Sequence, residues 1–184
     1  MFNLLKARKL NRLLSSQVQE RPRRVKEQKH KTSARFKKIL VAVDGSEESF
    51  KAAQYAIDLA KKEEERVQLI SLTVNETPSS LLSTIEPSAL ERWRERLKAQ
   101  SETFFDKIIS TYGLDINGGK VQMRTEMIDS VKSAYATIVE YAEKEKVDLI
   151  VLGTKGKTGF KRILLGSVAS GVVTHATCPV LVVR

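Results

Sequence analysis

The sequence has 184 residues, of which 41% are hydrophobic and 6% aromatic, and this is typical of one globular domain with an appendage. No apolar run approaches the roughly 18 residues of a membrane-spanning helix, and the only cysteine, Cys178, excludes an intramolecular disulfide, so we expect a cytoplasmic protein without a transmembrane segment. The net charge of +10 is concentrated in residues 1–35, which contain 11 Lys or Arg against Glu20 and Glu27.

The basic residues 1–35 are predicted to form an extension, partly disordered or helical, that precedes a domain at residues 36–184. One hypothesis is that this arm binds nucleic acid or an anionic membrane, because Arg21-Pro22-Arg23-Arg24 carries charge that neutralises phosphates. A second hypothesis is a targeting segment, since residues 1–19 contain Arg, Lys, Leu and Ser but no acidic residue. The sequence alone leaves these alternatives open.

The domain is predicted to begin with a strand, a turn and a helix. Residues 39–43 are all apolar, without the alternation of a half-exposed strand, which predicts a central parallel strand buried on both faces. Asp44-Gly45-Ser46 then predicts a turn, with Ser46 as the N-cap of a helix. Apolar residues at helical spacing extend that helix to Ala60.

Two further pairs of strand and helix are predicted downstream. A strand over residues 66–74 leads through a polar segment, which includes Pro78 and Pro87, to a long helix over residues 88–112. A shorter strand over residues 120–126 alternates polar and apolar side chains, which favours a peripheral place in the sheet. A helix over residues 130–145 follows it.

The C-terminal part of the chain completes the predicted sheet. An apolar strand at residues 149–152 is followed by a glycine-containing loop, a helix at residues 167–175 and a final strand at residues 180–183. Five strands that alternate with four helices predict an α/β fold with a parallel sheet, because right-handed crossovers leave few other arrangements.

The loop after the strand at residues 149–152 carries the clearest signal of function. Its glycines would let a ligand approach the backbone, and a helix that starts near Ser167 has unpaired N–H groups, so loop and helix can hold an anion such as a phosphate. An ordinary connection capped by Ser167 is the alternative. A Walker loop is excluded because its first glycine would fall at Val151, and a dinucleotide fingerprint is excluded because the first turn has Gly45 alone.

Asp44 is a second candidate for ligand contact. Ligands of such sheets lie beyond the carboxyl ends of the strands, where the strand order reverses. If the first strand is central, Asp44 and Gly153 face the same crevice, and a carboxylate suited to sugar hydroxyls then lies across from a loop suited to phosphates. The other interpretation is that Asp44 only shapes the turn ahead of the helix.

Three segments together resemble the universal stress protein family, in its ATP-binding branch. They are Val41-Ala42-Val43-Asp44-Gly45-Ser46, residues 148–154, and Gly166-Ser167-Val168-Ala169 with residues 178–183 after it. The resemblance covers residues 36–184 and includes the glycine pattern G-x2-G-x9-G-S/T. It implies a three-layer α/β/α fold, adenine nucleotide alpha hydrolase-like, with a five-stranded parallel sheet of order 3-2-1-4-5. It also implies a homodimer formed through the strand at residues 180–183.

The same resemblance implies a site for ATP, with Mg or Mn held through the phosphates where a divalent ion is present, and no metal site made by the protein. The nucleotide-binding residues that it implies are Val43, Asp44, Val74, Leu152, Gly153, Lys155, Gly156, Gly166, Ser167, Val168 and Ala169. This chain departs from the family at Lys155, where relatives often have histidine or another polar residue. It departs again at Ala169, where a hydroxyl residue is common.

The function indicated is a nucleotide-dependent regulatory module of a stress response rather than a dedicated enzyme. No catalytic residue is predicted, because His175 lies a helix away from the loop and Asp44 is assigned to the sugar, so we expect ATP hydrolysis to be slow at most. The alternative is an interaction protein. In that case the arm at residues 1–35 binds nucleic acid or anionic lipid, and the domain is a dimeric platform.

Overall fold

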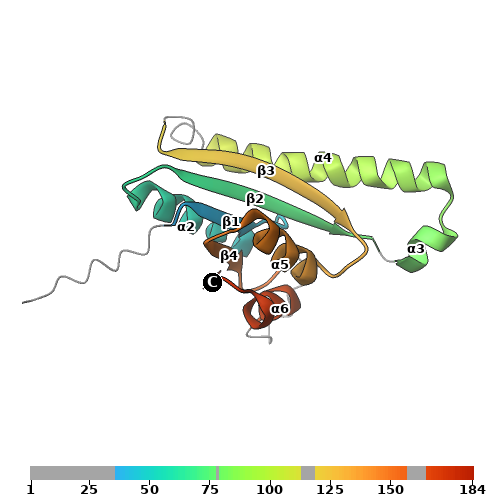
Figure 1. Cartoon of the computed structure of the whole chain (residues 1–184). Helices are drawn as coiled ribbons and strands as arrows, with labels where there is room; N and C mark the ends of the chain where they lie inside the picture. The colour runs from blue at the N-terminus through green and yellow to red at the C-terminus, as the bar shows by residue number, and fades with distance from the viewer. Residues whose placement is uncertain (1–35, 78, 113–118, 157–164) are drawn as a thin grey trace, which may run out of the picture. The chain divides into compact units, whose positions relative to one another are not determined.

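The domain is a β-sheet with helices on both faces in a computed structural model (Figure 1), which describes residues 36–77, 79–112, 119–156 and 165–184. The strands are β1 Lys38–Ala42, β2 Val67–Glu76, β3 Val121–Ser130, β4 Leu149–Gly153 and β5 Val180–Val183. The helices are α2 Glu47–Lys62, α3 Ser79–Thr84, α4 Pro87–Tyr112, α5 Ala134–Glu145 and α6 Ser167–His175. The predictions about residues 1–35 lie outside the described residues.

The five strands form one parallel sheet in the order β3-β2-β1-β4-β5, which confirms the predicted order. β1 is central. Its residues Ile39, Leu40 and Val41 pair with β2 on one side and with β4 on the other, and they are fully buried. Burial on both faces is the reason why this strand shows no alternation of polar and apolar residues.

Two hydrophobic cores join the sheet to the helices on its two faces. On one face, Val41 of β1 belongs to a buried cluster with Ile57 of α2 and Ile108 of α4. On the other face, Leu40 of β1 belongs to a cluster with Ile138 of α5 and with residues of α6. Neighbouring residues of β1 therefore point into opposite cores, and the three-layer α/β/α arrangement that we predicted is confirmed.

β2 and β3 are longer than predicted. The expected ends were residues 74 and 126, but the two strands stay paired to their last residues. The added residues of β2, Asn75 and Glu76, are polar, and the side-chain amide of Asn75 donates a hydrogen bond to Asp129 across the strands (3.1 Å). The added part of β3 also contains Ile128, which packs against the core. Polar cross-strand pairs of this kind support a strand that has no apolar pattern. Because β3 includes Ser130, α5 begins later than the predicted residue 130.

The short helix α3 lies within the segment that we predicted to be a polar connection. Its last residues, Ser83 and Thr84, donate side-chain hydrogen bonds to the carbonyl oxygen of Ser80 (3.0 and 2.9 Å). A helix of six residues is too short to show an apolar period, so the sequence pattern does not reveal it. α4 begins at Pro87, a residue type that suits the first turn of a helix.

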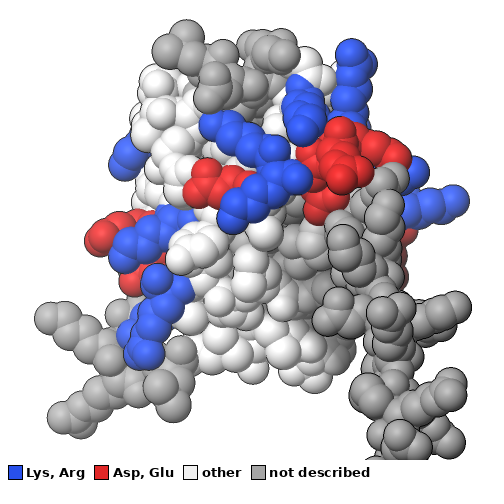
Figure 2. Space-filling view, turned by 90° about the vertical axis from the view of Figure 1, so that its left-hand side faces the viewer, with Lys and Arg blue, Asp and Glu red and all other residues white. Residues whose placement is uncertain are grey.

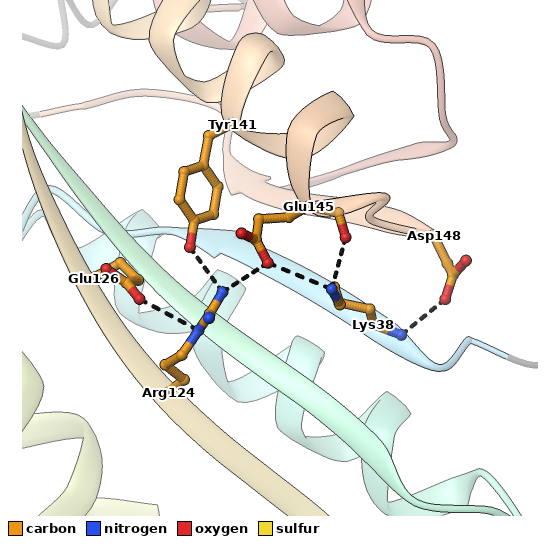
Figure 3. A network of polar contacts seen from close by, with 6 residues as sticks. All are labelled: Lys38, Arg124, Glu126, Tyr141, Glu145 and Asp148. Carbon is orange, nitrogen blue, oxygen red and sulfur yellow. Dashed lines mark hydrogen bonds and ion pairs between the residues drawn. The ribbon is translucent and has the colours of Figure 1, made fainter.

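A polar network joins β1, β3 and α5 near the edge of the sheet where the strands begin (Figure 3). Glu145 of α5 accepts hydrogen bonds from Arg124 of β3 (2.9 Å) and Lys38 of β1 (3.4 Å). Arg124 also donates to the hydroxyl of Tyr141 (2.9 Å) and forms an ion pair with Glu126. The hydrogen bond from Arg124 is the main cause that lowers the pKa of Glu145, whereas burial raises the pKa of Tyr141.

Charges of both signs mix on the face of the molecule where the strands begin, as Figure 2 shows. Lys37 forms an ion pair with Glu65 there (3.7 Å). The carboxylate of Asp148 accepts hydrogen bonds from the backbone N–H groups of Lys37 and Lys38 (2.8 Å each), which joins the starts of β1 and β4. The charges of this face therefore bind elements of the fold to each other.

We expect Glu145→Gln to lower the free energy of unfolding at neutral pH, because the variant loses an ionic hydrogen bond to Arg124. The pKa of Glu145 is lower in the folded than in the unfolded protein. Its contribution is therefore present above the unfolded carboxyl pKa of about 4.3 and is lost as the pH falls through the folded pKa. Urea denaturation at about pH 7 and about pH 3 should show a difference between the two proteins that shrinks at the lower pH.

Glu143→Gln is the control, because Glu143 is an exposed carboxylate on the same helix. This variant should change the free energy of unfolding little at either pH. An effect of Glu145→Gln that stays the same at both pH values would contradict the network's ionic role.

Candidate functional site

A cavity of about 430 Å³ opens at the carboxyl ends of β1 and β4. β1 lies between β2 and β4, so this is the place where the strand order reverses and where parallel α/β sheets bind their ligands. The described residues that line it are Ala42, Val43, Asp44, Ser49, Val74, Ala134, Ile138, Leu152, Gly153, Thr154, Lys155, Gly156, Gly166, Ser167, Val168 and Ala169.

The structure brings all eleven predicted site residues into the wall of this one cavity. That they bind a nucleotide stays a prediction. Sequence reasoning missed five lining residues, namely Ala42, Ser49, Ala134, Ile138 and Thr154. Of these, Ala134 and Ile138 are one helical turn apart on α5. Their spacing indicates a common helix face, but it does not indicate that the face lies at the carboxyl end of the sheet.

The turn between β1 and α2 places Asp44 at the cavity. Its Oδ1 accepts hydrogen bonds from the backbone N–H (3.0 Å) and from the hydroxyl (2.6 Å) of Ser46. Ser46 accepts a hydrogen bond from the N–H of Ser49 (3.2 Å) and so caps α2, as predicted. Asp44 therefore fits both interpretations that the sequence left open, because it shapes the turn and also lines the cavity.

Gly153 at the end of β4 and Gly156 in the loop after it lie where a side chain would meet another part of the protein. A Cβ atom at Gly156 would lie 2.6 Å from Oδ2 of Asp44, so a side chain at this position would require the carboxylate to move. A Cβ atom at Gly153 would lie 2.8 Å from the backbone carbonyl carbon of Glu48 in α2. We predicted these glycines for the approach of a ligand, and the structure adds that they let two segments of the chain approach each other.

The start of α6 faces the cavity without a side-chain cap. The N-cap is Gly166, in an extended conformation (φ −67°, ψ 161°), so the alternative of a cap by Ser167 is wrong. The N–H of Gly166 donates to the carbonyl oxygen of Thr154 (2.7 Å), which holds the helix start against the loop. Because residues 167–169 line the cavity, the positive end of the helix dipole lies beside it.

Another part of the cavity wall is apolar. Ile138 of α5 and Leu152 of β4 are 3% exposed, and both belong to the core on this face of the sheet. The start of α5 contacts the end of β2, where the N–H of Ala134 donates to the carboxylate of Glu76. The predicted strand ends at residue 74, before Glu76, so the sequence pattern does not indicate this contact.

Asp44 and Lys155 are the charged residues of the cavity wall among the described residues. His175 lies at the C-terminal end of α6, where its ring stacks on Tyr135 with 5.4 Å between the ring centroids.

In the part of the chain that the structure describes, no group of three or more His, Cys, Asp or Glu could hold a metal ion. Among the described helices, none has the length and hydropathy needed to cross a membrane. Burial raises the pKa of the Cys178 thiol.

Comparison with known proteins gives consistent results. A model described as the universal stress protein family matches residues 35–184. Universal stress protein MJ0531 of Methanocaldococcus jannaschii is 40% identical to this chain over 152 residues, which cover 81% of this chain and 82% of that protein. The structure of universal stress protein UspA from Lactobacillus plantarum is similar with a TM-score of 0.68 at 28% identity, and covers 82% of this chain and 99% of that one.

A third protein, more distant in sequence, was solved with a bound nucleotide. It is a universal stress protein in complex with cAMP, with 21% identity and a TM-score of 0.54 over 82% of this chain and 98% of that chain. At this identity the similarity concerns the fold alone.

We expect Glu76→Ala to destabilise the domain by about 1 kcal/mol, the usual cost of a lost helix cap, because the N–H of Ala134 loses its acceptor. Glu76→Gln keeps a side-chain oxygen at the same position and should recover most of this loss. Urea denaturation measures both changes. Glu102→Ala, at an exposed carboxylate of α4, is the control, and equal losses for Glu76→Ala and Glu76→Gln would contradict the capping role.

Proposed function

The chain belongs to the universal stress protein family, and we propose that it is an ATP-binding regulatory module of a stress response. The observation that carries the proposal is that Asp44 and the glycine-containing loop after β4 line one cavity. This cavity lies where the strand order of the sheet reverses. The cavity volume of about 430 Å³ also lies within the range of small-molecule sites.

The chemistry of the wall matches the parts of an adenine nucleotide. Val74, Ile138 and Leu152 offer an apolar surface suited to a purine ring. The Asp44 carboxylate is an acceptor suited to the ribose hydroxyls. The first turn of α6 offers N–H groups that have no partner within the helix, and Lys155 offers a positive charge, and both suit phosphates. The cAMP complex of the distant relative is consistent with a fold that accommodates such a ligand.

The same wall favours holding ATP over cleaving it rapidly. Asp44 is its one carboxylate among the described residues, and its Oδ1 is already engaged by Ser46. We therefore propose slow turnover at most, because a general base must be placed to take a proton from the attacking water. Mg or Mn would be held mainly by the phosphates of the nucleotide.

We also propose a homodimer formed through β5. This strand pairs with β4 and stands at the edge of the sheet that the described residues form. Its residues Val180, Leu181 and Val182 are only half-buried. Pairing of β5 with β5 of a second copy would bury these side chains and give the backbone of the edge a partner.

Isothermal titration calorimetry with ATP tests the nucleotide site directly. We expect the wild type to bind, and we expect Asp44→Ala to weaken binding roughly ten- to a hundredfold, the value of a lost hydrogen bond to a charged group. Gly156→Val should also weaken binding, because its side chain needs the space of the Asp44 carboxylate. Asp58→Ala, at an exposed carboxylate of α2, is the control. No detectable binding by the wild type at millimolar ATP would contradict the proposal.

Lys155 should act on the phosphates and not on the nucleoside. We expect Lys155→Met to reduce the affinity for ATP more than the affinity for adenosine. The excess loss should be larger at low ionic strength, because added salt screens exposed charges. Competition titrations with both ligands at two salt concentrations measure this difference, and an equal loss for ATP and adenosine would refute the assignment.

A further inference from the structure

The turn that holds Asp44 is covered by an aromatic ring of α4. Gly45, the middle residue of the turn, has a φ of 85°, in the left-handed region that favours glycine. A Cβ atom at Gly45 would lie 2.3 Å from Cζ and 2.4 Å from Cε1 of Phe104. The edge of this ring therefore lies directly against the backbone of the turn.

The ring of Phe104 packs on α2 and is partly buried against the core on this face of the sheet. It packs edge to face on Phe50 of α2, with 6.3 Å between the ring centroids and an angle of 83°. The Lys107 ammonium group lies 4.1 Å above the ring of Phe50, on the same pair of helices. Ile108, one turn further along α4, is fully buried in the core beneath. The packing of α4 on α2 and on this core thus brings Phe104 to Gly45.

The opposite side of the turn is equally constrained. Oδ1 of Asp44 accepts two hydrogen bonds from Ser46, and its Oδ2 fills the space that a side chain at Gly156 would need. The turn is therefore held between the glycine loop and the ring of Phe104. A displacement of the ring would be passed to the carboxylate, because a single residue lies between them.

We propose that Phe104, which is not among the lining residues of the cavity, is a positioning residue of the nucleotide site. Its ring lies against the backbone of Gly45 and so sets the position of the neighbouring Asp44 carboxylate. This inference rests on the proposed ATP site, in which Asp44 contacts the ribose. The sequence predicts Phe104 only as an apolar residue of a long helix.

The preference between two nucleotides distinguishes a positioning role of Phe104 from a general role in core packing. If Phe104 places the carboxylate at the ribose, its replacement should reduce the preference for ATP over 2′-deoxy-ATP, which lacks one hydroxyl group. A general loss of core packing should weaken the binding of both nucleotides by the same factor. The preference for ATP over 2′-deoxy-ATP would then stay unchanged.

The experiment compares the full-length wild type with Phe104→Leu, Phe104→Tyr and Ile108→Val by calorimetric titration of ATP and 2′-deoxy-ATP. Phe104→Leu should weaken the binding of ATP roughly five- to tenfold and bring the affinities for ATP and 2′-deoxy-ATP close together. Phe104→Tyr should act in the same direction, because its hydroxyl extends from Cζ, the atom nearest to the Cβ position of Gly45. Ile108→Val removes a buried methyl group from the same helix and should keep the preference.

A double-mutant cycle tests the contact itself. Gly45→Ala should impair ATP binding strongly, and the addition of Phe104→Leu should restore part of it, because the leucine vacates the space that the new methyl group needs. Strictly additive effects would overturn the inference.

The outcomes separate this inference from the proposed function. If the wild type binds ATP and prefers it to 2′-deoxy-ATP, an unchanged preference in Phe104→Leu would overturn the role of Phe104 and leave the ATP site intact. Equal binding of both nucleotides by the wild type would also overturn the role of Phe104, because the Asp44 carboxylate would then not distinguish a ribose from a 2′-deoxyribose. Absence of ATP binding by the wild type would overturn the proposed function and this inference together.

Discussion

The approach of Gly156 to the Asp44 carboxylate is the contact on which the cavity depends. Asp44 follows β1 and Gly156 follows β4, and these strands are neighbours because Ile39 pairs with Leu149 and Val41 with Val151. The register of two buried strands therefore brings two polar segments together that are more than a hundred residues apart in the chain. Glycine makes the final approach feasible, since any side chain there would meet the carboxylate oxygen. The start of α6 is then fixed to the same loop through Gly166.

Much of this arrangement could be predicted because buried parallel strands leave a clear trace in a sequence. β1, β4 and β5 are apolar runs, and the ends of β1 and β4 indicate that Asp44 and Gly153 share one crevice, whereas the other predicted site residues came from the resemblance to the family. The strand order itself came from the resemblance to a family and not from the pattern. The end of β2 could not be predicted, because Asn75 and Glu76 are polar residues of the kind found in loops, and Asn75 is paired with Asp129 only in the folded sheet. Ala134 and Ile138 were missed although the helix that carries them was predicted, because helical spacing does not show that their face lies at the carboxyl end of the sheet.

The two ends of the sheet differ in the use that they make of charge. Where the strands begin, Lys38, Arg124 and Glu145 form ionic contacts with each other, and their charges are satisfied inside the protein. Where the strands end, the described wall of the cavity has one acidic and one basic side chain, and the helix start of α6 has no side-chain cap. The ionic network of the domain and the candidate ligand site therefore lie at opposite ends of the same strands.

The extra length of β2 and β3 takes one wall of the cavity away from the central strand. β1 accompanies β2 only as far as Leu72, and beyond that residue the strand that pairs with β2 is β3. Where β1 and β2 separate, the hydroxyl of Thr73 donates to the carbonyl oxygen of Val43 (2.9 Å). Val74 pairs with Ile128 of β3, and Leu152, one residue beyond the pairing of β4 with β1, pairs with Val182 of β5. The two apolar walls of the cavity therefore take their positions from strands at opposite edges of the described sheet, β3 for Val74 and β5 for Leu152.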